Sequence, residues 1–355
     1  MKLGPIQLRW SYLFCATGSA LLLPLLMLGL LALDTPITTS GVCYTLGAVV
    51  SALGLVMAPW LRRTSWLLFA VGMITLVSTA GVRLRGGGVG TAVRLVTFPE
   101  LNSTRWGNHL IHERDLSLFG QRIGALTGVA LNRREADGLT EALTAAYASL
   151  DTVDSTTSSP CLSTYLLLQH PTAFDMVVVE PEHSTQPTAA IVYLHGFAGN
   201  FTVQAWLVAQ AARELNMLTV APSVGFVGNW WTPRGEATVK HTIAYLRSCG
   251  IQRIYLAGLS NGAVGTCRLA PKLRNDISGL ILISGADAHA ADSGLPVLAL
   301  QGAHDDRMPA YEANQYINQA GTQGTYREFD GDHLLLAKRA KEVQAALKEW
   351  LVRQE

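Results

Sequence analysis

Residues 254–262 read Ile-Tyr-Leu-Ala-Gly-Leu-Ser-Asn-Gly, so a Gly-x-Ser-x-Gly motif closes an apolar run. Such runs are typical of buried parallel strands, and the following segment, Ala263–Leu273, has the composition of a helix. A serine between a strand and a helix lies on a sharp, strained turn that exposes its hydroxyl. We therefore predict that Ser260 is a nucleophile. Glycine is required on both sides because a side chain there would crowd the neighbouring strand and helix.

Two later loops carry the groups that would activate this serine. Asp305 follows the apolar run Pro296–Leu300, which predicts an acid just past the end of a buried strand. His333 follows the expected last strand and precedes a long amphipathic helix. The order serine, aspartate, histidine distinguishes one class of serine hydrolase from the others. Asp306 remains an alternative to Asp305, because a loop at a strand end can present either residue.

An upstream turn is predicted to stabilise negative charge on a reacting oxygen. The run Ala190–Leu194 reads as a strand and leads directly into His195 and a glycine. We expect the backbone N–H groups of Phe197 and of Asn261, which follows the nucleophile, to form an oxyanion hole. His195 is expected to be structural and not to act as a base.

With these elements in this order, residues 173–355 resemble an α/β-hydrolase. The short connecting segments resemble the lidless, esterase-like members of that family, including the dienelactone-hydrolase-like group. The resemblance implies a doubly wound, mostly parallel sheet with helices on both faces and a Ser-His-Asp site at the carboxyl ends of the strands. It further implies an enzyme that cleaves a carboxylic ester through an acyl-serine intermediate. A thioesterase, an acyltransferase, a peptidase or a non-catalytic membrane-tethered binding protein remains an alternative.

Two tryptophans are predicted to contact the substrate. Trp230 and Trp231 follow the expected strand Leu218–Ala221, so they should lie near the nucleophile and line an acyl or aromatic pocket. Ordinary packing against a loop is the alternative interpretation.

We expect no cofactor, no metal ion and no nucleic acid as a partner. The formal net charge is +1 and only 15% of residues are charged, which gives no reason to expect nucleic-acid binding. Two acid and histidine clusters could converge on a metal, but neither has the spacing of a known zinc signature. These clusters comprise His304, Asp305, Asp306, Asp330, Asp332 and His333.

The first 85 residues are predicted to form a transmembrane region. Three apolar stretches, at about 11–33, 42–60 and 66–82, are long enough to cross a bilayer as helices, and Asp34 is the only acid before Glu100. We expect about three transmembrane helices before the α/β domain, and therefore a multi-pass membrane protein. The expected partners are the membrane and a small-molecule or lipid-like acyl substrate.

The distribution of basic residues predicts the side on which the catalytic domain lies. Lys2 and Arg9 flank the first stretch, the first loop has no Lys or Arg, and Arg62 and Arg63 lie in the second loop. Positive residues favour the cytoplasmic side, so an odd number of spans places the catalytic domain outside the cytoplasm. Three arginines after the third stretch oppose this orientation.

Residues 86–172 are predicted to be a linker and accessory segment. The segment begins with the glycine-rich stretch 86–90, and Leu139–Leu150 has a helical pattern. We expect the first strand of the sheet at Phe174–Val179, and the accessory segment is a candidate cover for the active site.

Overall fold

The computed structural model describes residues 5–85, 92–128, 131–153, 158–182 and 186–354. The predicted glycine-rich linker at 86–90 lies outside these residues. The chain divides into two compact units. The helical unit comprises Met1–Gly88 and His109–Asp137, and the sheet unit comprises Val89–Asn108 and Gly138–Glu355.

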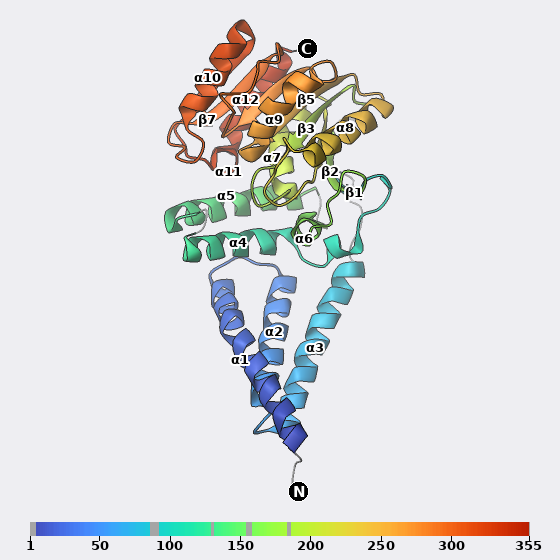
Figure 1. Cartoon of the computed structure of the whole chain (residues 1–355), viewed down its shortest axis with the longest axis vertical. Helices are drawn as coiled ribbons and strands as arrows, with labels where there is room; N and C mark the ends of the chain where they lie inside the picture. The colour runs from blue at the N-terminus through green and yellow to red at the C-terminus, as the bar shows by residue number, and fades with distance from the viewer. Residues whose placement is uncertain (1–4, 86–91, 129–130, 154–157, 183–185, 355) are drawn as a thin grey trace. The chain divides into compact units, whose positions relative to one another are not determined.

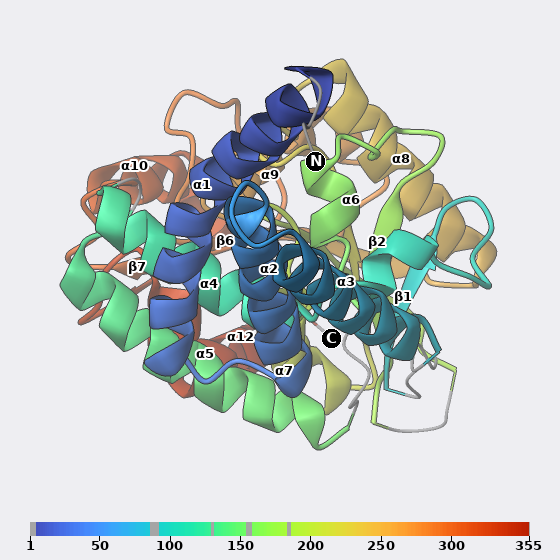
Figure 2. The ribbon, with the colours of Figure 1, turned by 90° about the horizontal axis from the view of Figure 1, so that it is seen from below.

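Three long helices dominate the helical unit: α1 (Pro5–Leu33), α2 (Thr39–Met57) and α3 (Arg62–Arg85) (Figures 1 and 2). Each contains a stretch long and apolar enough to cross a membrane, as predicted. A fourth helix, α4 (Glu113–Thr127), is joined to this group by polar contacts. The backbone N–H and the hydroxyl of Thr38 each donate to the Asp115 carboxylate at 2.6 Å.

Small residues allow the three long helices to pack closely. Helix α2 contacts both α1 and α3. A Cβ atom on Gly54 would lie 2.6 Å from the backbone nitrogen of Phe69, and the Ser65 hydroxyl donates to the Gly54 carbonyl at 2.7 Å. Large apolar side chains point outward instead, among them Leu23, Leu30, Leu67, Ile74 and Val77. Small residues at the contacts and exposed apolar side chains outside are typical of helix packing in membranes.

The sheet unit is built on one eight-stranded sheet with the order β1-β2-β4-β3-β5-β6-β7-β8. The strand β2 runs antiparallel to both of its neighbours, and the strands from β3 to β8 pair in parallel. This order with a reversed second strand is that of the α/β-hydrolase fold, so the predicted fold class is confirmed. The strands are β1 (Val93–Thr97), β2 (Asp175–Val179), β3 (Ala189–Leu194), β4 (Leu218–Pro222), β5 (Arg253–Leu259), β6 (Gly279–Ile283), β7 (Val297–Gly302) and β8 (Gly324–Phe329).

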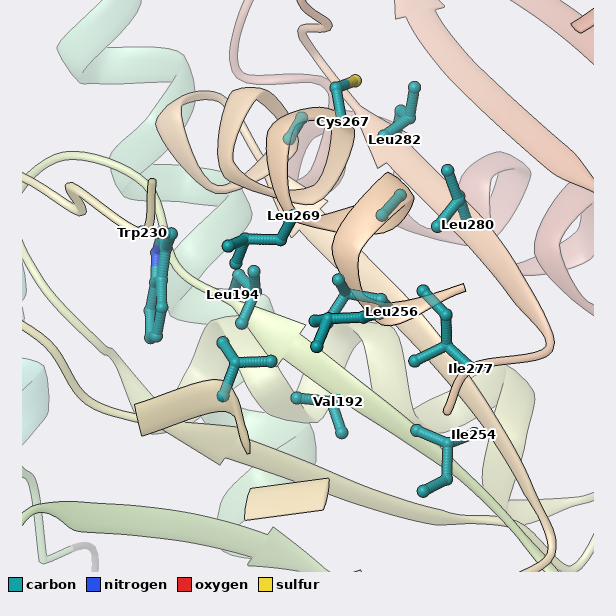
Figure 3. Packing of buried hydrophobic residues seen from close by; sticks show 14 of the residues in the cluster. Val192, Leu194, Trp230, Ile254, Leu256, Cys267, Leu269, Ile277, Leu280 and Leu282 are labelled. Atoms are coloured by element: carbon teal, nitrogen blue, oxygen red, sulfur yellow. The ribbon is translucent and has the colours of Figure 1, made fainter. Parts of the chain in front are cut away.

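Helices cover both faces of the sheet, which explains why the central strands are apolar at nearly every position. Helices α8, α9 and α10 share one core with residues such as Val192, Leu256 and Leu282 (Figure 3). On the opposite face Tyr255 meets Trp350 of α12 edge-on, with ring centroids 5.8 Å apart. The remaining helices are α5 (Arg133–Asp151), α6 (Cys161–Tyr165), α7 (Thr202–Arg213), α8 (Pro233–Ser248), α9 (Asn261–Leu273), α10 (Ala310–Ala320), α11 (Leu335–Lys338) and α12 (Ala340–Val352), with 3-10 turns at Trp106–His109 and Gly321–Gln323.

Two features of the sheet unit differ from the sequence prediction. The sheet begins at β1, about eighty residues before the expected first strand, because Val93 and its neighbours pair with β2. The final helix is divided at Arg339 into α11 and α12, where the backbone leaves helical geometry (φ −120°, ψ 32°).

The strand order defines where a ligand can approach. The chain passes from β3 to β4 on one side of β3 and returns to β5 on its other side, so the direction of winding changes between β3 and β5. In open α/β sheets the crevice at such a point lies beyond the carboxyl ends of the strands. Leu194 pairs with Gly258 there, which brings the turn after β3 beside the turn after β5.

Candidate active site

Ser260 occupies a strained turn between β5 and α9. Its backbone angles are φ 54° and ψ −118°, a conformation that residues with side chains rarely adopt. A Cβ atom on Gly258 would collide with the backbone of Gly262, and one on Gly262 would collide with the Leu194 carbonyl oxygen. Both flanking residues must therefore be glycine, as the sequence predicts.

A continuous chain of hydrogen bonds joins Ser260, His333 and Asp305. The His333 Nε2 atom lies 3.0 Å from Ser260 Oγ, and its Nδ1 atom lies 2.9 and 3.0 Å from the two Asp305 carboxylate oxygens. Because a carboxylate only accepts hydrogen bonds, Nδ1 carries the proton and Nε2 is left to accept from the serine. It is Asp305, and not the exposed Asp306, that meets His333.

The buried Asp305 carboxylate is held by more than His333. The backbone N–H groups of Arg307 and Met308 donate to its Oδ1 at 3.0 and 2.9 Å, and the Gln301 side chain donates to its Oδ2 at 3.0 Å. Burial alone raises the pKa of this carboxyl, but the hydrogen bonds from His333, Met308 and Arg307 outweigh burial and lower the pKa below its ordinary value. Asp305 is thus kept ionised opposite the imidazole.

Gln301 is a site residue that the sequence analysis missed. It is the fifth residue of β7, it is buried, and its amide also donates to the Met308 carbonyl at 2.8 Å. Gln301 therefore fixes the loop that presents Asp305. A polar residue ending an otherwise apolar strand was the available signal.

The predicted oxyanion groups lie on the two turns that flank the nucleophile. A Cβ atom on Gly196 would lie 3.1 Å from the Ser260 Cβ, so the turn after β3 touches the serine. Within the described part of the chain, the backbone N–H groups of Phe197 and Asn261 donate no hydrogen bond. These two N–H groups are therefore available to a ligand oxygen at the nucleophile.

His195 is fully buried beneath this turn. Its Nδ1 lies 2.8 Å from the Gly196 carbonyl, and its Nε2 lies 3.3 Å from the backbone nitrogen of Val224. The N–H of Val224 is a donor, so Nε2 must accept and the proton sits on Nδ1. Burial lowers the pKa of His195 to about 4, against the opposing hydrogen bond to Gly196. The ring is neutral, and its position agrees with the structural role expected for it.

The two tryptophans have different environments, and the prediction for Trp230 requires correction. Trp230 is completely buried among core residues such as Leu194 and Leu269 (Figure 3), and its indole N–H donates to the His195 carbonyl at 2.8 Å. Because that N–H finds a buried acceptor, Trp230 supports the turn after β3 and cannot contact a substrate. Trp231 is half-buried beneath the guanidinium of Arg268, 5.0 Å from its ring centroid, and its substrate contact stays a prediction.

Other aromatic side chains form the rim of the site. Phe197, Phe226 and Tyr165 are partly exposed, and we call them the aromatic rim. The rings of Phe197 and Phe226 meet at 4.7 Å between centroids, and those of Tyr165 and Phe226 at 5.9 Å. The Asn261 amide donates to the Val227 carbonyl at 2.8 Å, which ties the loop carrying Phe226 to the residue after the nucleophile.

Several members of the two acid and histidine clusters make other contacts. His304 pairs with Asp330 at 3.2 Å, and Asp332 pairs with Lys338 at 2.6 Å. Across residues 5–354, apart from the gaps given above, no three His, Cys, Asp or Glu side chains are grouped so that they could hold a metal ion.

Comparisons with known proteins find similarity in structure alone. No family model and no curated protein sequence matches the chain. The similar solved structures include Est1E from Butyrivibrio proteoclasticus, with 16% identity over 51% of this chain and 94% of that chain and a TM-score of 0.44. They also include XC6422 from Xanthomonas campestris, described as a serine hydrolase without a lid, with 19% identity over 53% and 92% of the two chains and a TM-score of 0.43. The assignment of the sheet unit to the α/β-hydrolase fold rests on its strand order.

Proposed function

We propose that this protein is a membrane-anchored serine hydrolase that cleaves a carboxylic ester through an acyl-enzyme on Ser260. The observation that carries the proposal is the hydrogen-bonded chain from Ser260, on its strained turn, through His333 to Asp305. Among the described residues, the N–H groups of Phe197 and Asn261 have no acceptor. A serine that only shaped a turn would need neither hydrogen bonds to a histidine and an aspartate nor a strained backbone.

The geometry supports a two-step mechanism. His333 Nε2 takes the Ser260 proton as Oγ attacks the ester carbonyl, and the ionised Asp305 stabilises the imidazolium that forms. The N–H groups of Phe197 and Asn261 would bind the resulting oxyanion. The imidazolium then protonates the leaving alcohol as its bond to carbon breaks. Water attacks the acyl-serine with His333 as base, which releases the acid and restores the serine.

The membrane anchor is proposed from the packing of α1, α2 and α3. Their contacts are made by small residues and their outward surfaces are apolar, which would be unfavourable in water. Lys2 and Arg9 lie at the amino-terminal end of the first apolar stretch, and Arg62 and Arg63 begin α3. These basic residues favour a cytoplasmic amino terminus, and hence a catalytic unit outside the cytoplasm. A phosphatase reporter fused after Glu355, active only outside the cytoplasm of a bacterial host, tests this orientation.

The proposed activity is tested with full-length protein in detergent and a p-nitrophenyl ester of short chain length. We expect turnover that falls by about 10³-fold or more in the Ser260→Ala and His333→Ala variants. Ser248→Ala, which removes an exposed serine from α8, is the matched control and should keep full activity. Equal turnover by Ser260→Ala and the native chain would refute the proposal.

A further inference from the structure

Three consecutive leucines are exposed at the end of α6 in the sheet unit. The exposed fractions of Leu166, Leu167 and Leu168 are 61%, 80% and 50%. Single exposed leucines are ordinary, but a contiguous apolar patch marks a surface that contacts another apolar phase. Leu167 also has a φ of 59°, which is unfavourable for a leucine and persists only where surrounding contacts impose it.

A buried polar cluster holds this segment in place from both ends. The Asp175 carboxylate is fully buried and accepts from Ser163 at 2.5 Å, Gln169 at 2.9 Å and Arg105 at 2.9 Å. Ser163 precedes the leucines and Gln169 follows them, and the Leu168 N–H donates to the Ser163 carbonyl at 2.8 Å. The leucines are therefore presented by an ordered loop, not by a frayed end.

The leucines are continuous with the aromatic rim of the candidate active site. Tyr165 directly precedes them, and its hydroxyl donates to the Ala198 carbonyl at 2.9 Å, one residue after Phe197. Its ring meets Phe226, which in turn meets Phe197. An apolar surface thus extends from the exposed leucines to Phe197, which follows the glycine that contacts Ser260.

The segments that form this surface carry no charged side chain. None of the stretches 160–169, 196–203 and 222–231 contains Asp, Glu, Lys or Arg. Contact of these three segments with hydrocarbon would therefore desolvate no charge of their own. The same chain carries three helices long and apolar enough to span a bilayer. If they do, a lipid surface is present beside every copy of the sheet unit.

We infer that Leu166–Leu168 and the aromatic rim dock on a lipid surface, so that the nucleophile receives esters from the lipid phase. The substrate class is then an ester with a long apolar chain that partitions into bilayers. The substrate class rests on the proposed function, whereas docking does not require catalysis.

Docking is tested on full-length protein in lipid nanodiscs that contain lipids with a nitroxide near the headgroup. A fluorescent amino acid is incorporated in place of Leu167, and in a second protein in place of Val352, which is also exposed but lies on α12 outside the patch. We expect strong nitroxide quenching at position 167 and little at 352. Equal quenching at the two positions would overturn the proposal. A blue-shifted but unquenched signal at 167 would also overturn it, because a protein surface would then cover the leucines.

The substrate class is tested by comparing two esters in the same nanodiscs. The Leu166→Ser/Leu167→Ser double variant should hydrolyse a bilayer-dissolved long-chain ester at least about tenfold more slowly, because buried leucine contacts of this size change affinity by about that factor or more. A water-soluble acetate ester should change less than about twofold, and Val352→Ser should change neither. Equal losses on both esters would overturn the inferred substrate class. If Ser260→Ala retains both activities while position 167 is quenched, docking stands and the proposed function fails.

Discussion

Acidification should destabilise the sheet unit through His195, which is buried in its neutral form beneath the turn that carries Phe197. Protonation would place a second ring N–H against the Val224 N–H, which now donates to Nε2. It would also leave a charge in a site with no carboxylate among the ring's hydrogen-bond partners, which are the Gly196 carbonyl and the Val224 N–H. The turn that presents the Phe197 N–H should therefore lose its support as the pH falls.

The size and direction of this effect follow from the two pKa values. The pKa of His195 is about 4 in the folded chain, against 6.5 for an unperturbed histidine. Above pH 6.5 both states are neutral and the effect is absent. Between pH 6.5 and 4 the unfolded state binds a proton that the folded state does not, so stability falls by about 1.4 kcal/mol per pH unit. The total loss approaches about 3 kcal/mol, and it stops below pH 4.

The assay compares the native chain with His195→Gln, whose amide can replace both hydrogen bonds and does not titrate. Urea unfolding of the full-length protein in detergent is followed by near-ultraviolet circular dichroism at half-unit steps from pH 7.5 to 4.5. Other titrating groups act in both proteins, so the difference between their free energies of unfolding isolates His195. We expect that difference to change by about 1.4 kcal/mol per pH unit below pH 6.5 in favour of the variant. If the free energies of unfolding of the native chain and of His195→Gln change with pH in parallel, the reasoning is refuted.

Three substitutions test other parts of the account. Asp305→Asn should lower kcat for a soluble ester by about 10⁴-fold, because the carboxylate that keeps the His333 proton on Nδ1 and stabilises the imidazolium would be gone. Asp306→Asn is the control and should change kcat less than about twofold. Gly258→Ala should lower the free energy of unfolding by at least about 2 kcal/mol, because the alanine Cβ would collide with the Gly262 backbone. Gly107→Ala, where the added Cβ meets open space, should lower it by less than about 1 kcal/mol. Equal unfolding midpoints for the two variants would contradict this prediction. Asp175→Asn should cost about 2 kcal/mol in urea unfolding by weakening the buried cluster around the carboxylate, and an unchanged midpoint would show that the cluster contributes little.

The local parts of the site could be predicted from the sequence because each depends on a short pattern. The glycines around Ser260 reflect close backbone contacts at the turn, and Asp305 and His333 each follow a strand that ends at the same edge of the parallel sheet. The structure brings these three side chains within hydrogen-bond distance. Their catalytic roles stay a proposal.

The parts that could not be predicted depend on distant pairings. Val93–Thr97 joins the sheet by pairing with residues about eighty positions later, and no local pattern specifies that register. Trp230 follows a strand end, as a pocket residue would, but its exposure depends on whether the indole N–H reaches the His195 carbonyl. Gln301 likewise gains its role only through the loop that folds back over it.

The exposure of the aromatic rim could not be predicted from the sequence either. Phe226 precedes Trp230 and Trp231 on the same loop, yet it is Phe226 that is partly exposed beside Phe197. Tyr165 comes from the accessory segment 86–172, for which the sequence predicts only a candidate cover of the site. Composition could identify apolar residues in these loops, but only the tertiary packing decides which of them face solvent.

The most direct test of the central claim is covalent labelling of the full-length protein in detergent with a fluorophosphonate, followed by peptide mapping. The account predicts a single adduct on the Ser260 hydroxyl, because His333 Nε2 lies 3.0 Å from Ser260 Oγ and would take its proton. Labelling should be lost in His333→Ala and retained in Ser248→Ala. A folded protein that carries no adduct, or carries it on another serine, would contradict the account.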